Sequence, residues 1–237
     1  MSGLLALGIS IMISGTVMAE DKPEADFSLG AYSQYVWRGF AFSDSSVVIQ
    51  PSMTIAYKGF GVNLWGNLDT DEVGLDTMNW NETDMTISYD GSAGKIGYGA
   101  GWIYYNVDGA DDTQEIYASI SGDVLLAPTL TLYTDIDSVP GWYATLGISH
   151  SVNVAEGMNL DLGAQIGYLD DDDTYNEFHD ALISASMTFP ISDYVSVTPE
   201  LYYSFALTSD AETVIAAGSV DGEEDHFFGG LSASFAF

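Results

Sequence analysis

Apolar and polar residues alternate along most of the chain that follows residue 26. Between Phe227 and Phe237, every second residue is Phe, Leu, Ala or Gly, and the residues between them are mostly small. Side chains of a strand point alternately to its two faces, so this period of two predicts strands with one apolar face. The alternation recurs at 47–57, 60–68, 84–89, 158–168 and 195–205. Helical spacing of apolar residues is not sustained after residue 20, so no helix is predicted there.

Twelve segments are predicted to be strands. They begin near Phe27, Val47, Phe60, Thr83, Lys95, Gln114, Thr129, Trp142, Met158, Asp180, Tyr194 and His226. Most are about 9–13 residues long, the length of a tilted strand that crosses a bilayer. An even strand number is typical of bacterial outer-membrane barrels. The sequence therefore predicts an all-β fold, a transmembrane antiparallel up-and-down β-barrel of about 12 strands.

The connections between these segments alternate in length and charge. Short connections at 58–59, 90–94, 127–128, 153–157 and 190–193 contain few acidic residues. Six mostly longer connections hold 24 of the 35 Asp and Glu residues, at 39–46, 69–82, 106–115, 135–141, 170–180 and 208–225. Outer-membrane barrels have short periplasmic turns and longer external loops. This orientation predicts acidic external loops and places both chain ends in the periplasm.

Composition separates this interpretation from a soluble β-sandwich or lipocalin-like barrel. The polar positions of the strands hold small neutral residues with almost no Lys, whereas a solvated outer face normally carries many charges. Mean hydropathy is +0.12, yet no internal run reaches the roughly 18 apolar residues of a membrane helix. The net charge of −31 excludes a typical nucleic-acid binder, because phosphate recognition needs clustered cations. The absence of Cys excludes disulfides and thiolate metal sites.

The N-terminal segment has the pattern of a signal peptide. Residues 4–18 are apolar, and Val17-Met18-Ala19 precedes the acidic pair Glu20-Asp21. We predict a signal peptide over residues 1–19 and an outer-membrane β-barrel over residues 20–237, in a Gram-negative bacterium; a buried N-terminal helix is the alternative. This location implies contact with outer-membrane lipid and lipopolysaccharide, with the barrel-assembly machinery during biogenesis, and with small solutes, but not with nucleic acid.

A short signature lies near the start of the predicted barrel. It comprises Tyr35-Val36-Trp37-Arg38-Gly39, then Gln50-Pro51, then Gly59-Phe60 through Trp65-Gly66-Asn67. Over residues 27–70 the chain resembles the TorF family of porins, in which a Y-V-W-R-G element ends the first strand and a G-F-x-x-x-x-W-x-S/N element follows the next hairpin. The resemblance implies an outer-membrane barrel and a transport role, and beyond residue 70 it is architectural only.

Inward polar residues are the candidates for a selectivity site. Arg38 is the only Arg in the chain, and its parity with Tyr32 and Gln34 points it into the lumen. A lumenal Arg needs a carboxylate partner. The candidate set is Arg38, Gln34, Asn63, Asn67, Asp84, Asp123, Asp161 and Glu200, with the four carboxylates as possible partners of Arg38. One interpretation is a charged constriction that favours cations, and the other is a structural ion pair between the first strand and the wall.

Two acidic runs of the external loops could bind Ca²⁺ or Mg²⁺ loosely, and no other cofactor is predicted. They are Asp170, Asp171, Asp172, Asp173 and Glu223, Glu224, Asp225. Carboxylate oxygens suit these hard cations, and weak sites of this kind bind at about 10⁻⁴–10⁻³ M. The other interpretation is a solvated acidic surface suited to a saline setting.

No enzyme is predicted. The three His residues, His150, His179 and His226, are not part of a recognisable catalytic motif, and no Ser lies in a G-x-S-x-G turn. We predict a porin for passive diffusion of small polar solutes or cations. The alternatives are a structural, non-conducting barrel and, less favoured, an outer-membrane enzyme, which a cluster of His, carboxylate and Ser at the outer rim would support.

Overall fold

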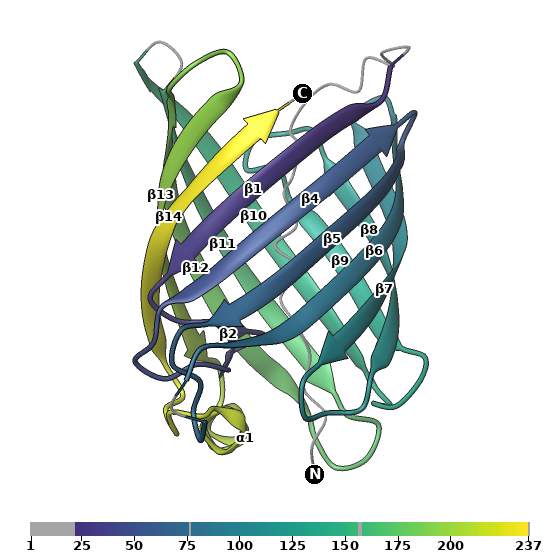
Figure 1. Cartoon of the computed structure of the whole chain (residues 1–237). Helices are drawn as coiled ribbons and strands as arrows, with labels where there is room; N and C mark the ends of the chain where they lie inside the picture. Colours follow the sequence, from purple (N-terminus) through teal and green to yellow (C-terminus); the bar gives the residue numbers. More distant parts are fainter. Residues whose placement is uncertain (1–21, 76, 156–157, 237) are drawn as a thin grey trace.

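A closed barrel of antiparallel strands forms the body of the protein (Figure 1). The computed structural model describes residues 22–75, 77–155 and 158–236, so the predicted signal peptide lies outside the described residues. The twelve wall strands are β1 (Glu24–Tyr32), β4 (Val48–Tyr57), β5 (Phe60–Asp69), β6 (Asn79–Ala93), β7 (Ile96–Val107), β8 (Thr113–Gly122), β9 (Thr129–Asp135), β10 (Trp142–Ala155), β11 (Met158–Asp170), β12 (Asn176–Pro190), β13 (Val195–Ala206) and β14 (His226–Ala236). β1 pairs with β14 to close the sheet, with Phe27 opposite Phe235. The predicted fold class is confirmed, and each predicted strand start lies within about four residues of the observed one.

The outer face of the barrel is apolar. Leu64, Ile87 and Leu162 are 44%, 45% and 44% exposed, and outward Ile49 and Phe235 are partly covered by neighbouring side chains. Every wall strand contributes such side chains, which alternate with inward polar ones. An apolar surface around a closed barrel needs an apolar solvent, and for this architecture that solvent is a lipid bilayer. Among the described residues, no helix is long and apolar enough to cross a membrane.

The two ends of the barrel differ. At one end, which we call the turn end, short turns join the strands, β1 begins and β14 finishes (Figure 1). The longer connections gather at the opposite loop end, together with helix α1 (Ser209–Gly218). Toward the turn end the inward positions are small, as in the pairs Gly61–Ser88, Gly97–Ser121 and Gly163–Ser184. Toward the loop end they hold Tyr, Trp, Asp and Glu side chains.

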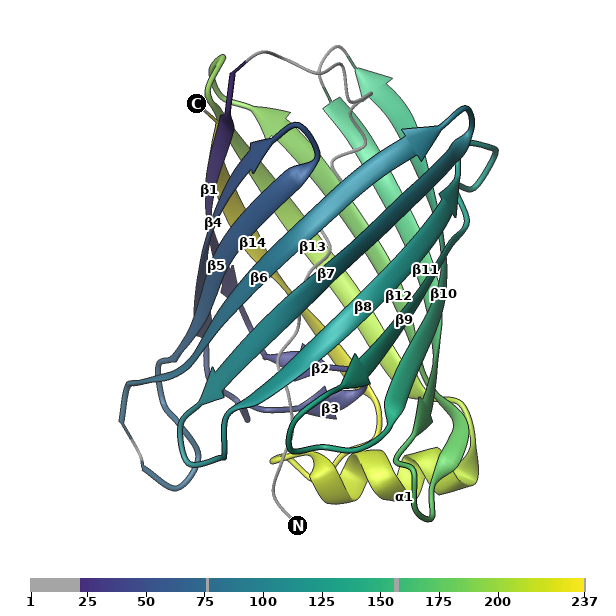
Figure 2. The ribbon, with the colours of Figure 1, turned by 90° about the vertical axis from the view of Figure 1, so that its right-hand side faces the viewer.

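From the sequence, the Y-V-W-R-G segment was expected to end the first strand. In the structure it lies outside that strand. β1 ends at Tyr32, and the chain enters the barrel as a small hairpin of β2 (Val36–Trp37) and β3 (Phe40–Ala41), seen inside the wall next to α1 (Figure 2). Trp37 and Phe40 are both 4% exposed. If the segment continued β1, it would project beyond the bilayer and leave these aromatic side chains in water. The inserted hairpin buries them instead.

Helix α1 contradicts the prediction that no helix follows residue 20. The Thr208 hydroxyl accepts the backbone N–H of Ala211 at 3.1 Å, and Asp210 and Glu212 lie in the first turn, where the helix dipole favours negative charge. Ala211 and Ile215, one turn apart, are fully buried against the hairpin. The buried stripe contains only these two residues, which is too short to stand out as a helical period.

Two β-bulges at the loop end turn additional side chains inward. Between β11 and β12, Gly167 lies opposite both His179 and Asp180, and both are buried. Between β5 and β6 the extra residue is Asn81, whose side-chain oxygen accepts from Asn67 at 2.7 Å. A bulge locally breaks the alternation of a strand. Inward positions beside a bulge therefore cannot be counted from the sequence period.

Candidate functional site

The tight turn of the inserted hairpin holds Arg38 inside the loop end. Arg38 and Gly39 have φ values of 46° and 86°, the pattern of a two-residue turn that needs positive φ at both positions. A Cβ on Gly39 would lie 2.8 Å from Ile215 Cδ1 and 3.2 Å from Asp180 Cβ. The turn is therefore enclosed between α1 and strand β12 of the wall.

The Arg38 guanidinium is bound at its edge and on its faces. Nη1 and Nη2 donate to Oε1 and Oε2 of Glu115 on β8, both at 2.8 Å. Its Cζ lies 4.1 Å from the ring centre of Trp37, 4.9 Å from that of Tyr133 and 4.4 Å from that of Tyr143. Bidentate pairing and ring stacking are the contacts for which a guanidinium is better suited than an ammonium group. Among the described residues, this is the only ion pair of an Arg or Lys with a carboxylate.

Glu115 was missing from the predicted partners of Arg38. From the sequence, Glu115 was expected in the connection 106–115, whereas β8 begins at Thr113 and makes Glu115 an inward wall residue that is 2% exposed. The ion pair joins the inserted hairpin to the wall, not the first strand to the wall. The strand predicted to begin near Gln114 places Glu115 on the same face as Tyr117, and this shared parity is the signal that would have identified it.

His179 holds the backbone of the same turn. Its Nε2 lies 3.1 Å from the Arg38 carbonyl oxygen, and its Nδ1 lies 2.7 Å from the Tyr175 hydroxyl. A carbonyl can only accept, so Nε2 carries the proton, and in the neutral ring Nδ1 accepts from Tyr175. Burial, with added repulsion from Glu177, raises the pKa of Tyr175, so its hydroxyl remains protonated at physiological pH. The loop before β12 is thus linked to the hairpin turn.

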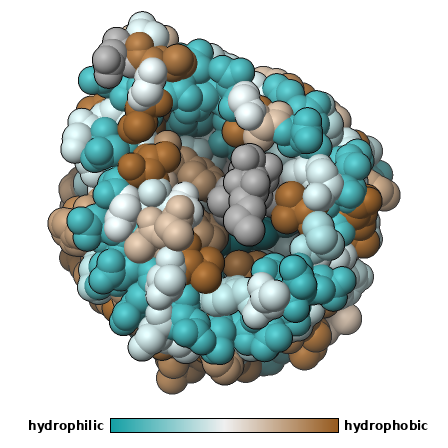
Figure 3. All heavy atoms as spheres, turned by 90° about the horizontal axis from the view of Figure 1, so that it is seen from below, coloured by the Kyte–Doolittle hydropathy of each residue, from teal (hydrophilic) through white to brown (hydrophobic). Residues whose placement is uncertain are grey.

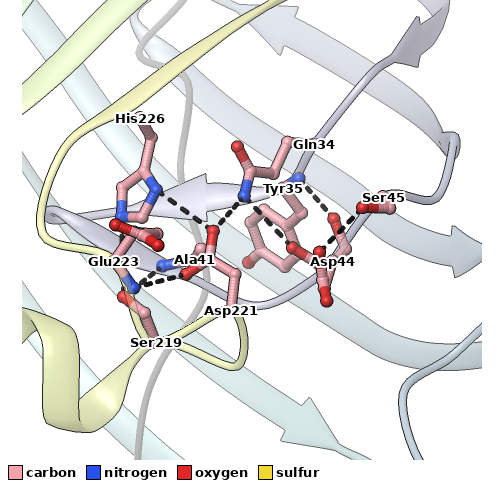
Figure 4. Close-up of polar contacts among 10 residues, drawn as sticks. Gln34, Tyr35, Ala41, Asp44, Ser45, Ser219, Asp221, Glu223 and His226 are labelled. Carbon is pink, nitrogen blue, oxygen red and sulfur yellow. Dashed lines mark hydrogen bonds and ion pairs between the residues drawn. The ribbon is translucent and has the colours of Figure 1, made fainter.

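The hairpin and α1 are joined at the loop end (Figure 4). Nε2 of Gln34 donates to Asp221 Oδ2 at 2.7 Å, and the Ala41 N–H donates to Ser219 Oγ at 3.1 Å. The Val220 N–H in turn donates to the Ala41 carbonyl at 2.9 Å. The two inserted elements therefore form one unit.

One group of side chains in this unit makes contacts in the order Ser–His–Asp, as in a catalytic triad: Ser219, His226 and Asp221. His226 Nε2 lies 3.5 Å from Ser219 Oγ, and His226 Nδ1 lies 3.4 Å from Asp221 Oδ2 (Figure 4). A serine hydrolase needs a reachable hydroxyl beside oxyanion donors. Here Ser219 is only 8% exposed and its Oγ already accepts the Ala41 N–H. The contacts tether α1 to the hairpin, and they present no accessible nucleophile.

Among the described residues, five buried acidic side chains lie at inward positions around the hairpin, against one Arg. They are Asp69, Glu82, Asp84, Glu115 and Asp180. The Tyr35 hydroxyl donates to Glu82 Oε2 at 2.9 Å. Asp69 Oδ2, Glu82 Oε1 and Asp84 Oδ1 are buried and have no hydrogen-bond partner among the described residues. Acidic side chains therefore outnumber the single Arg at the loop end of the lumen.

Most of the predicted lumenal residues lie on inward wall positions. Asn63 donates to Ser52 Oγ at 2.8 Å, and Asn67 is fully buried. Glu200 accepts from the Tyr32 hydroxyl at 3.2 Å. Asp84 is buried beside the hairpin, and Asp161, far from Arg38 toward the turn end, accepts from Ser151.

Two predicted lumenal residues are placed elsewhere. β8 ends at Gly122, so Asp123 is exposed in the turn to β9, where its N–H donates to the Lys95 carbonyl at 2.8 Å. The prediction for Asp123 is wrong because the strand stops one residue earlier. Gln34 lies in the segment that leads into the hairpin, so it joins the hairpin to Asp221 instead of lining the wall.

The acidic runs lie at the loop end, whose face shows mainly hydrophilic residues with apolar ones between them (Figure 3). No group of three or more His, Cys, Asp or Glu side chains is placed to hold a metal ion within the described part of the chain. Oδ1 of Asp171 instead accepts the N–H groups of Asp173, Thr174 and Tyr175 at 3.0, 2.9 and 2.9 Å. Slight burial of Asp171 raises its pKa, but these N–H groups outweigh it and lower the pKa overall.

Comparisons with known proteins give no family assignment. No family model matches the chain, and no curated protein matches it. Among solved structures, an outer membrane channel from Pseudomonas putida F1 is 9% identical with a TM-score of 0.48, over 91% of this chain and 94% of that one. An anion-selective porin from Comamonas acidovorans is 8% identical with a TM-score of 0.39, over 91% and 99%. These similarities are too low to argue from, and the barrel is established by its own strand pairing.

Proposed function

We propose that the protein is an outer-membrane porin that admits small polar solutes or cations by passive diffusion. The observation that carries the proposal is the lining of the lumen toward the turn end. Inward positions there hold mostly Gly, Ser, Thr and Asn, with an acidic residue at Asp161, and Asn63 bonds to both Ser52 and Thr54 across the strands. Small polar side chains cannot form a close-packed apolar core, so this half of the lumen is suited to water.

The proposed orientation follows from the two ends of the barrel. Short turns and the ends of β1 and β14 would lie in the periplasm, with the acidic loops outside. Lipid and lipopolysaccharide would contact the apolar belt, and the assembly machinery would insert the barrel. Membership of the TorF family, from the resemblance over residues 27–70, is part of this proposal.

Selectivity would be set where the hairpin narrows the lumen. Buried acidic side chains outnumber Arg38 there, and each one that ionises adds fixed negative charge, which in a low-dielectric passage favours cations. We therefore propose a cation-preferring constriction formed by the wall and the hairpin.

The test is conductance of the purified, refolded protein in a planar bilayer. We expect discrete current steps and a K⁺ over Cl⁻ preference in reversal potentials under a salt gradient. Arg38→Ala should raise both the step size and the K⁺ preference, because it removes the hairpin anchor and the one fixed cation at the constriction. Lys58→Gln, which removes a cation from an exposed turn, should change neither.

The hydrogen-bonded hairpin favours one second candidate, a structural barrel that does not conduct. If folded wild type and folded Arg38→Ala both give no current, the porin proposal fails and the structural barrel is favoured.

The Ser219 contacts allow a direct check of the enzyme alternative. Labelling of wild type by a fluorophosphonate, and loss of labelling in Ser219→Ala, would support a hydrolase; we expect no labelling.

A further inference from the structure

The side chains that bind Arg38 belong mostly to the wall. Glu115, Tyr133 and Tyr143 lie on the neighbouring strands β8, β9 and β10, and Tyr133 and Tyr143 are themselves 6.2 Å apart between ring centres. They supply a two-oxygen fork and two ring faces to the guanidinium, independently of the hairpin.

This wall surface is held in place by its own hydrogen bonds. The Tyr105 hydroxyl donates to Glu115 Oε2 at 2.9 Å, and the Tyr143 hydroxyl donates to Asp180 Oδ1 at 2.8 Å. Neither bond involves the hairpin. Preorganised groups lose little freedom on binding, so the surface would keep its shape for a cation other than Arg38.

The surroundings leave room for more positive charge. Asp84 lies directly opposite Tyr105 on the neighbouring strand, and Glu82 is the next inward residue of the same strand. Glu82 Oε1 and Asp84 Oδ1 are buried without a hydrogen-bond partner among the described residues. A buried carboxyl group without a partner favours its protonated form, and a cation brought by a solute would favour the ionised form by pairing with it.

We propose that Glu115, Tyr133 and Tyr143 form a binding site for solutes that carry a guanidinium group, and that Arg38 occupies this site as a built-in competitor. A planar guanidinium satisfies both oxygens of Glu115 while it stacks on the two rings, which a compact ammonium cannot do. The inference deepens the proposed function, since it names a class of permeant that would displace Arg38 and loosen the hairpin.

The first experiment empties the site. Methylguanidinium is titrated into refolded Arg38→Ala, with tryptophan fluorescence as the readout because Trp37 and Trp65 pack in the same cluster. We expect a saturable change, at least about tenfold weaker in wild type, where Arg38 competes. Methylurea, the neutral isostere, should give no saturable change.

Three further variants keep the result interpretable. Adding Glu115→Gln to Arg38→Ala should weaken methylguanidinium binding at least about tenfold, whereas adding Glu24→Gln, the same change at an exposed site of the turn end, should not. Arg38→Lys keeps the positive charge but lacks the planar guanidinium, so it replaces Arg38→Ala in the experiment if Arg38→Ala does not fold. Arg38→Lys should bind methylguanidinium more tightly than wild type does. Equal responses to methylurea, or no saturable binding in whichever folded variant is used, would overturn the inference.

Bilayer recordings separate this inference from the proposed function. Methylguanidinium added to wild type should increase the open fraction several-fold more than an equal concentration of tetramethylammonium. If the protein conducts but the folded variants do not bind methylguanidinium, the site is wrong and the porin stands. If the variants bind but no condition gives a current, the site stands and the porin proposal fails.

Discussion

Gly39 is the residue at which the backbone conformation and the packing of the hairpin meet. Its φ of 86° would strain any side chain, and a Cβ there would also contact Ile215 Cδ1 at 2.8 Å. We expect Gly39→Ala to lower the free energy of unfolding by about 2–4 kcal/mol, from left-handed strain plus overpacking. Urea unfolding in lipid, followed by tryptophan fluorescence, measures this loss.

Gly74 is the matched control for that substitution. It has nearly the same φ, 85°, but a Cβ there would meet nothing within 4 Å. Gly74→Ala should therefore lower the free energy of unfolding only by the left-handed backbone strain, about 1–2 kcal/mol. Equal losses in the two variants would show that Gly39 is not enclosed between α1 and the wall.

At the scale of an element, the Thr208 cap governs whether α1 forms. Its hydroxyl accepts the Ala211 N–H, one of the groups that a helix start leaves without a partner. Thr208→Ala should destabilise α1 by about 1 kcal/mol. Faster hydrogen exchange across residues 209–218, with wall strands unchanged, is the expected result.

Thr213 provides the control within the same helix. It is exposed, and its hydroxyl donates to the Ser209 carbonyl at 3.1 Å, which the helix does not require. Thr213→Ala should leave exchange in α1 unchanged or slower, since Ala has the higher helix propensity. If both variants loosen α1 alike, the cap is not what stabilises it.

For the whole molecule, the apolar belt makes a directional prediction about lipid. Leu64 lies midway along β5 and is exposed outward, so Leu64→Arg should cost about 2–4 kcal/mol in a bilayer. Leu75, which is also exposed but lies in a loop, should tolerate Arg with little change. Unfolding from phospholipid vesicles measures both, and a tolerated Leu64→Arg would place the belt in water.

The excess of acidic residues at the loop end leads to a second prediction at this scale. Their repulsion acts across a Debye length of about 10 Å at 0.1 M salt. Millimolar Ca²⁺ or Mg²⁺ should slow proteolysis of the loops more than Na⁺ does at equal ionic strength, by loose bridging of the runs 170–173 and 223–225 or of lipopolysaccharide phosphates. Equal protection by Na⁺ would indicate simple screening.

The period of two determined the wall by itself. A one-residue slip exchanges the two faces of a strand, so Leu64, Ile87 and Leu162 could face only the lipid. The predicted strand starts lie close to the observed ones for the same reason. The charge and length of the connections likewise distinguished the two ends of the barrel.

Only the tertiary structure decided what lies inside the loop end. The partner of Arg38, the inward turn of His179 at a bulge and the docking of α1 all depend on contacts between segments 77 to more than 140 residues apart in the sequence. Alternation describes one strand at a time, and it is lost where a bulge adds a residue or a loop folds back. Arg38 was recognised from the sequence as a lumenal cation, but Glu115 became its partner only because the closed barrel brings β8 beside the inserted hairpin.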